Sequence, residues 1–258
     1  MARFTVVVSL ILLATSFAVA QSDPQALAYA AQSITAMTGG TPISDATLTG
    51  TVTWIAGSDT DTGTGSLKAL GTGESRMDLA LGSGTRSEIR DASTGSALGQ
   101  WTAPNNSSGL FAFQNCFTDA VWFFPALSSL AAGPNVVLIY VGQETRNGVA
   151  VQHLRSYVNQ ADPLPPPLPS AQQLSTMDFY LDAATFLPVA ILFNSHPDSD
   201  PSTNISVEID FSNYQALGGV TVPLHVQRYV QGSLEVDLSL SSAAFNTGLS
   251  QSNFAISQ

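Results

Sequence analysis

Carboxylate side chains are the first groups in this sequence that could support catalysis. Asp182 lies in LDAATFLPVAILFN (181–194), where one carboxylate stands beside a run of large apolar residues. A general acid or base usually works with a second titratable group, and this stretch supplies none. Asp also favours turns by bonding its own backbone two residues on, and Pro188 is tolerated at a strand start. We therefore interpret Asp182 as the corner of a hairpin rather than as a catalytic residue.

Other residues with reactive chemistry are few and scattered. The histidines lie far apart, without an H-x-x-x-H pattern or a Cys partner, at His153, His196 and His225. Such spacing does not predict a metal site. Cys116 lies among aromatic residues with no basic neighbour in sequence, which favours a small buried apolar side chain over a nucleophile. With no G-x-S-x-G motif and no phosphate-binding loop, we expect a protein that is not an enzyme and needs no metal or cofactor.

The composition narrows the classes of partner. The net charge is −11, charged residues are only 10% of the chain, and no basic patch occurs. Nucleic acid and an anionic membrane surface are therefore poor partners. Hydrophobic residues make up 44% of the chain, enough for a large core, and a single Cys excludes an intramolecular disulfide.

The N-terminus has the pattern of an export signal. Arg3 precedes an apolar stretch over 4–13, and Ala18-Val19-Ala20 forms an A-x-A cleavage site. Gln21, not Cys, follows it, so the lipobox of a membrane-attached lipoprotein is missing. We expect residues 1–20 to be removed and residues 21–258 to form one soluble domain in the periplasm or outside the cell, with no transmembrane segment.

Two helices and about ten strands are predicted. Ser22-Asp23-Pro24 starts a helix that ends at Gly39-Gly40, with an apolar stripe at Leu27, Ala30, Ala31, Ile34 and Met37. A second, central helix is predicted over 118–134. Alternating apolar and polar residues predict strands elsewhere, with hairpin turns at 93–95 and at Asn147-Gly148, and a Pro-rich loop at 162–170.

So many antiparallel strands favour curling over a flat sheet. The expected fold is mainly β: a strongly curved antiparallel sheet, or incomplete half-barrel, with the N-terminal and central helices on its concave face.

Three segments together resemble the outer-membrane lipoprotein carrier superfamily. The stretch 182–188 is similar to that superfamily's D-x-x-T-x-L-P corner, and IDFSNYQALGGVTVPLHVQ (209–227) is similar to the segment that follows it. FNTGLSQSNF (245–254) resembles the N-x-x-L-x-x-x-x-F ending. The resemblance is specific over 178–254. It implies a half-barrel around an apolar cavity that takes acyl chains, with an Arg that fixes a lid; Arg76, Arg86 and Arg90 are the candidates here.

A set of large apolar residues could line such a cavity, or could equally fill an ordinary core. The set is Trp54, Trp122, Phe123, Phe124, Leu127, Leu138, Tyr140, Phe179, Leu181, Ile191, Phe193, Leu224 and Val226. Within this set, VWFFP (121–125) places three consecutive aromatic residues on a short predicted helix, where they cannot all face the same side. We therefore expect this helix to be a movable lid over the mouth of the cavity. The alternative is a helix that plugs the cavity and never moves.

The sequence therefore predicts an exported, monomeric protein of the cell envelope that binds a lipid, such as the acyl chain of a lipoprotein, and that could dock on a membrane complex. The alternative is a structural or interaction domain of the envelope with a filled core and no ligand.

Overall fold

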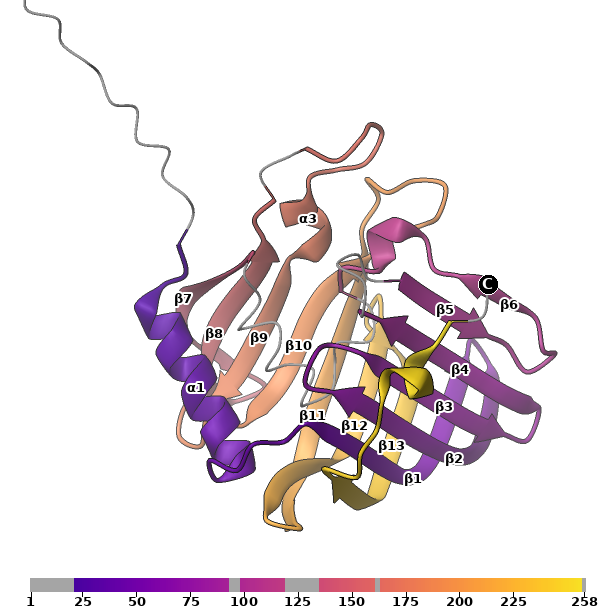
Figure 1. The fold of residues 1–258 in the computed structure, drawn as a ribbon, viewed down its shortest axis with the longest axis horizontal. Helices are drawn as coiled ribbons and strands as arrows, with labels where there is room; N and C mark the ends of the chain where they lie inside the picture. The colour runs from indigo at the N-terminus through magenta and orange to yellow at the C-terminus, as the bar shows by residue number, and fades with distance from the viewer. Residues whose placement is uncertain (1–20, 93–97, 119–134, 161–162, 257–258) are drawn as a thin grey trace, which may run out of the picture.

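The computed structural model describes residues 21–92, 98–118, 135–160 and 163–256. In these ranges the chain forms one antiparallel sheet of 13 strands with short helical segments beside it (Figure 1). The strands are β1 (Asp45–Ala56), β2 (Asp59–Leu70), β3 (Ser75–Leu81), β4 (Gly84–Asp91), β5 (Leu98–Thr102), β6 (Ser108–Leu110), β7 (Val136–Arg146), β8 (Val149–Val158), β9 (Met177–Asp182), β10 (Pro188–Ser195), β11 (Ile205–Leu217), β12 (Val220–Val230) and β13 (Ser233–Phe245). The helical segments are α1 (Pro24–Thr38), α3 (Ala171–Ser175) and the 3-10 turns η1 (Phe113–Asn115) and η2 (Gln251–Phe254).

Two meanders share this sheet. The strand order is β6-β5-β4-β3-β2-β1-β13-β12-β11-β10-β9-β8-β7, so β6 and β7 form the two edges. β1 pairs with β13 in the middle, where Val52 faces Leu238. The sheet is therefore open, and pairing of its first strand with its last ties together segments that lie far apart in sequence.

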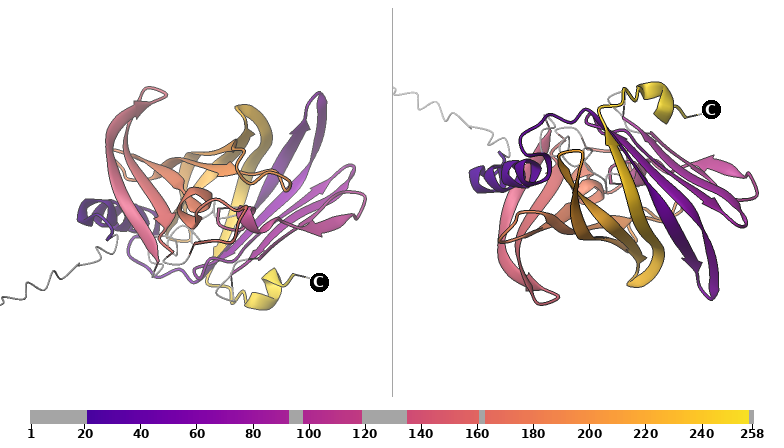
Figure 2. Two further views of the ribbon diagram at one scale, coloured as in Figure 1. Left: turned by 90° about the horizontal axis from the view of Figure 1, so that it is seen from above. Right: turned by 90° about the horizontal axis from the view of Figure 1, so that it is seen from below.

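One ion pair shows how strongly the sheet curves. Nη1 of Arg228 on β12 donates to Oε2 of Glu88 on β4 at 2.9 Å, although β13, β1, β2 and β3 lie between these strands. Neighbouring strands lie about 4.8 Å apart, so this separation on a flat sheet would be roughly 24 Å. Only bending toward this face brings the two side chains together, and Figure 2 shows the resulting trough. The predicted strongly curved antiparallel sheet is confirmed.

The main hydrophobic core lies on this concave face. Its most buried members include Leu48, Leu79, Ile191, Ile209 and Leu238, each 0% exposed. Burial of such a side chain contributes about 1.5–3 kcal/mol. Gly65 matters here, because a Cβ at this position would come within 2.5 Å of Leu238 Cδ2. The glycine thus lets the Leu238 side chain lie directly against β2.

The C-terminal segment covers part of the convex face. Phe254 of η2 is fully buried against Leu70 of β2 and Ile89 of β4. Asp45, at the start of β1, accepts hydrogen bonds from the backbone N–H groups of Thr247 at 2.8 Å and Gly248 at 3.0 Å. The segment that follows β13 is therefore anchored at both of its ends.

The predicted turns and the Pro-rich loop are confirmed where the structure describes them. Asn147 and Gly148 have φ of 49° and 80° and join β7 to β8 in a tight hairpin. Residues 163–170 of the Pro-rich loop hold no strand, and the same sheet continues on both sides of them. The turn predicted at 93–95 lies within 93–97, outside the described residues.

Helix α1 is confirmed, and Ala30, Ile34 and Met37 of the predicted stripe face the sheet. Asp23 caps its first turn, and Gly39 ends it with φ of 60°. Leu27 is 42% exposed and Ala31 is exposed, whereas Ala26, Ser33 and Met37 are buried. The stripe was wrong only at Leu27 and Ala31, because the helix is rotated so that Ala26 and Ser33 face the sheet in their place. The central helix predicted over 118–134 falls almost wholly outside the described residues.

α1 lies on the concave side, where it contacts β7 and β12 (Figure 1). Met37, near its C-terminal end, joins the main core. No helix among the described residues is long and apolar enough to cross a membrane.

Candidate functional site

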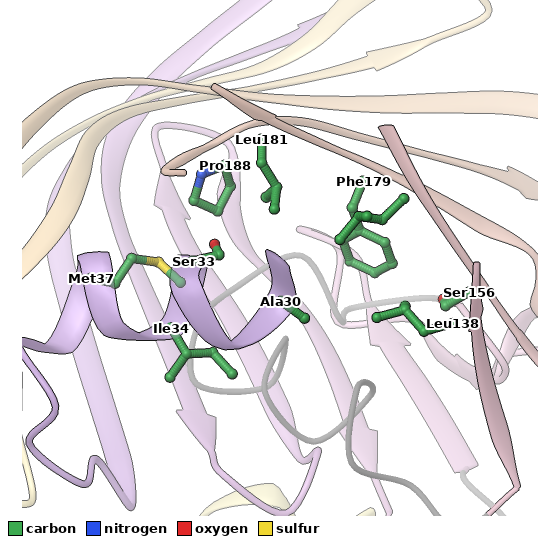
Figure 3. Close-up of a pocket in the computed structure, with 10 residues that line it drawn as sticks. Ala30, Ser33, Ile34, Met37, Leu138, Ser156, Phe179, Leu181 and Pro188 are labelled. Carbon is green, nitrogen blue, oxygen red and sulfur yellow. The ribbon is translucent and has the colours of Figure 1, made fainter. Parts of the chain in front are cut away.

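A narrow apolar pocket lies between α1 and strands β7 to β10 (Figure 3). α1 forms one wall with Ala30, Ser33, Ile34 and Met37. The strands form the other wall with Leu138, Leu154, Ser156, Phe179, Leu181 and Pro188. The free space is about 40 Å³ at the centre and about 470 Å³ when the open mouth is included.

Small side chains on α1 create this gap. Ala30 and Ser33 face the sheet in the middle of the helix, opposite the much larger Phe179 and Leu181 (Figure 3). Protein interiors normally close such gaps by interdigitation of side chains. Larger residues support α1 on either side: Tyr29 packs edge-on against Tyr140 with ring centroids 5.2 Å apart, and Met37 packs into the main core. The middle of the helix therefore spans an incompletely filled space.

The N-terminal end of α1 is tied to the sheet edge. The backbone N–H of Asp23 donates to the carbonyl of Leu138 at 2.7 Å, and Leu138 N–H donates to Ser22 Oγ at 3.0 Å. The chain before α1 thus pairs briefly with β7. Any widening of the pocket must come from the rest of α1 or from rotation of side chains.

The chemistry of the lining suits binding rather than reaction. Ser33 and Ser156 are its polar members, 5% and 3% exposed, and neither hydroxyl forms a hydrogen bond within the described part of the chain. The central space exceeds the roughly 10–15 Å³ that one water needs, but ligand pockets usually measure about 300–1,000 Å³. An apolar ligand would therefore have to widen the pocket as it enters.

The structure brings only part of the predicted set together. Leu138, Phe179 and Leu181 line the pocket, and Tyr140 packs beside them. Five others lie in or against the main core: Trp54, Ile191, Phe193, Leu224 and Val226. Four lie outside the described residues, together with the expected lid: Trp122, Phe123, Phe124 and Leu127.

Several lining residues were not proposed as ligand-binding from the sequence. Ala30, Ile34 and Met37 belonged to the predicted helix stripe, so a signal existed, but it was interpreted only as a helix face. Ser33, Ser156 and Pro188 give no signal, because small or polar residues on a strand or helix do not reveal a gap.

Asp182 is the corner residue that the sequence predicted. Its Oδ1 accepts hydrogen bonds from the N–H of Ala184 at 3.0 Å and from the N–H and Oγ1 of Thr185 at 2.7 and 2.9 Å. Burial raises the pKa of this carboxyl, but these donors outweigh burial and hold the pKa below its usual value. The carboxylate therefore stabilises the turn between β9 and β10.

Cys116 and His153 also have local partners. Cys116 is buried, 4% exposed, as expected of a small apolar residue. His153 lies between two carboxylates, with Nε2 2.8 Å from Asp178 Oδ1 and Nδ1 2.9 Å from Glu144 Oε1. Its ring stacks on Tyr180 at 4.5 Å. This arrangement holds the β7–β8 hairpin against β9, away from the pocket.

The three candidate arginines lie in different surroundings. Arg76 pairs with Asp78 at 2.8 Å on the convex face. Arg90 donates to the carbonyls of Gly73 and Cys116. Arg86 places its guanidinium carbon 4.2 Å over the Trp54 ring.

Comparison with known proteins shows a similarity of fold but no match in sequence to a family or a curated protein. No protein-family model matches the sequence, and no curated protein matches it. A domain described as an outer-membrane lipoprotein-sorting protein from Vibrio parahaemolyticus has a similar structure, with a TM-score of 0.57, 14% identity and coverage of 89% of this chain and 96% of that one.

Two further solved structures match over a similar length. A DUF1329 family protein from Desulfovibrio piger has a TM-score of 0.55, 11% identity and coverage of 91% and 98%. A LolA superfamily protein from Nitrosomonas europaea has a TM-score of 0.55, 10% identity and coverage of 90% and 97%. The chain therefore shares the open, curved fold of these solved structures, as the sequence resemblance to the lipoprotein carrier superfamily indicated.

Proposed function

We propose that this chain is an exported protein of the cell envelope that binds an apolar ligand, such as an acyl chain, between α1 and strands β7 to β10. The observation that carries this proposal is the apolar gap beneath Ala30 and Ser33. In this proposal residues 1–20 are a cleaved signal, residues 21–258 act as a monomeric single domain, and the protein works by shielding its ligand rather than by catalysis.

The energetics allow binding without a charged anchor. Transfer of one CH₂ group from water to an apolar site contributes about 0.8 kcal/mol, so a long acyl chain could gain on the order of 10 kcal/mol before the cost of opening the pocket. That cost falls mainly on contacts of α1, because the rest of the concave face is a tightly packed core.

The small volume of the pocket beneath α1 favours one alternative function, a ligand-free interaction domain. A central space of about 40 Å³ is also compatible with a ligand-free interaction domain whose core is merely imperfectly packed. The two functions differ in one respect that can be measured, namely whether an apolar molecule enters beneath α1.

Native mass spectrometry of residues 21–258, purified without detergent, tests the proposal. We expect a co-purifying lipid, or uptake of one added hexadecanoate per chain, in the folded protein and its loss on denaturation. The variant Ala30→Phe fills the gap, whereas Ala31→Phe places the same ring on the exposed face of the same helix.

Uptake that survives in Ala31→Phe and disappears in Ala30→Phe would support the pocket as the binding site. A folded wild-type protein that neither carries nor takes up any apolar molecule would reject the proposal in favour of the interaction domain.

A further inference from the structure

The concave face carries charged side chains some distance from the pocket. Arg86 and Glu88 of β4 face Leu79 and Met77 of β3, which both belong to the main core. Residues opposite one another on antiparallel strands share a face of the sheet. The two charged side chains therefore point into the trough and not into solvent on the convex side.

Trp54 and Arg228 lie on the same face, because both face Val236 of β13. Arg228 is committed to carboxylates: it lies 2.9 Å from Glu88 and 3.3 Å from Glu235. Burial raises the pKa of Glu235; the charge of Arg228 opposes this effect, that of Glu88 adds to it, and that of Arg86 opposes it to a smaller extent. Arg228 thus serves as the shared counter-ion of two glutamates.

Arg86 is different, because its charge lowers the pKa of Glu235 without a direct contact. No ion pair and no hydrogen bond of its guanidinium occurs with any described residue, and its contact is with the Trp54 ring at 4.2 Å. Nε of Arg86 is buried without a hydrogen-bond partner, and so is Nε1 of Trp54. Two neighbouring side chains therefore present buried N–H donors that lack acceptors.

Buried donors of this kind call for an acceptor. Guanidinium and indole N–H groups only donate, so they cannot satisfy one another. Native proteins leave few such groups unpaired, and an unmatched pair in a trough is a reason to look for a ligand. An anionic oxygen fits best, since charge-assisted hydrogen bonds to Arg are the strongest that a side chain makes.

Trp54 lies on the same row of paired residues across the sheet as Phe179, which lines the pocket. Successive pairings across six strands join Phe179, Ile191, Ile209, Arg228, Val236 and Trp54. The row would measure roughly 24 Å on a flat sheet, and the curvature shortens the direct path. Between the ends of the row lie the apolar core residues Ile191, Ile209 and Val236, together with Arg228, whose charge is paired with Glu88 and Glu235. A molecule with one polar end and one long apolar end matches this order.

We propose that Arg86 and Trp54 form a subsite for the anionic oxygen head group, a carboxylate or phosphate, of an acyl ligand. The assignment rests on the proposed function for the chain of the ligand, but it concerns a separate part of the concave face. It makes the preferred ligand an acidic amphiphile rather than a neutral lipid.

Isothermal titration calorimetry with dodecanoate, dodecanol and acetate tests this assignment. We expect the wild-type protein to bind dodecanoate roughly 10–100-fold more tightly than dodecanol, the range for hydrogen bonds to a charged group. Acetate alone should not bind at millimolar concentration. Arg86→Gln should abolish the preference and leave dodecanol binding unchanged, and Trp54→Phe, which keeps the ring but removes the donor, should reduce it.

Arg155→Gln is the matched control, because it removes the same charge from the convex face, where Arg155 is 45% exposed beside Asp178. The inference fails if dodecanoate and dodecanol bind equally, if Arg155→Gln has the same effect as Arg86→Gln, or if acetate binds as tightly as dodecanoate. If neither long-chain compound binds at all, the proposed function itself fails.

Discussion

Two regions of one sheet differ in how completely they are packed. The filled half, made of β1–β3 and β11–β13, has Leu48, Ile209 and Leu238 fully buried and a C-terminal segment clamped over its convex side. The pocket half, made of β7–β10 with α1, leaves space beneath Ala30 and Ser33. Both halves have strands of similar pattern. The difference lies in what covers the concave face: large side chains from facing strands in one half, and the small-residue side of a helix in the other.

The largest expected effect comes from the filled half. Leu238→Ala should lower the free energy of unfolding by about 2–5 kcal/mol, because a cavity forms where the packing cannot relax. Leu181→Ala, next to existing space, should fall at the lower end of that range. Urea unfolding of the two variants measures the contrast, and equal losses would contradict the difference in packing.

Substitution of Asp45 tests how the C-terminal segment is anchored to the filled half. Burial raises the pKa of this carboxyl, but the donors Thr247, Gly248 and Ser44 outweigh burial and hold it below the ordinary value of 3.8. Because the folded pKa is the lower one, its stabilisation is present above pH 3.8 and is lost as the pH falls through the folded value. Asp45→Ala should cost about 1–2 kcal/mol at pH 7, because hydrogen bonds to a charged group are lost.

The same variant should lose its disadvantage at low pH. Thermal unfolding of wild type and Asp45→Ala at pH 7 and pH 3 gives the comparison. A difference between the proteins that does not shrink at pH 3 would show that the carboxylate charge is not what anchors the C-terminal segment.

Filling the pocket half should affect binding more than stability. Ala30→Phe should weaken hexadecanoate binding at least about tenfold, which corresponds to about 1.4 kcal/mol. Its thermal midpoint should stay close to that of Ala31→Phe, since both add one ring to the same helix. If Ala30→Phe unfolds far below the control, the gap is not large enough to accept a side chain, and the contrast between the halves weakens.

The smallest effect concerns Asp210 on β11. Burial raises its pKa to about 6, and the hydrogen bond and charge of Glu208 add to the shift while Arg146 opposes it. The folded pKa lies above the unfolded one, so the native state is favoured below pH 3.8 and loses stability as the pH rises toward 6. Asp210→Asn should therefore stabilise the protein by on the order of 1 kcal/mol at pH 7.5 and little at pH 4.

Equal effects of Asp210→Asn at both pH values, measured by urea unfolding, would contradict this titration. Arg146 also binds Glu208 from the tip of the β7–β8 hairpin, so the result reports on how that hairpin is held on the convex side.

Local chemistry in the sequence predicted much of this fold. Asn147-Gly148 and Asp182 specify their turns through their own backbone preferences, and period-two patterns specify the strands. The pairing of β1 with β13 has no local signal, because it depends on backbone contacts between residues nearly the whole chain apart. Leu27 on α1 was misplaced for a related reason: it is apolar in any sequence pattern, but tertiary packing buries Ala26 and Ser33 and leaves Leu27 exposed.

The candidate site was less predictable than the fold. Large apolar residues such as Phe193 and Leu224 fill the core, as they do in most proteins. A gap depends instead on small residues facing large ones across elements, and the sequence does not show which residues face each other. Arg86 was singled out only through the family resemblance, and its unpaired state became visible only with the strand register.

Photo-crosslinking with a hexadecanoic acid that carries a terminal diazirine tests the central claim most directly. We expect saturable labelling of peptides from α1 (Pro24–Thr38) and β9 (Met177–Asp182), suppressed by an excess of unlabelled hexadecanoate. Saturable labelling confined to strands β1–β3, or labelling that the competitor does not reduce, would contradict an apolar ligand site beneath α1.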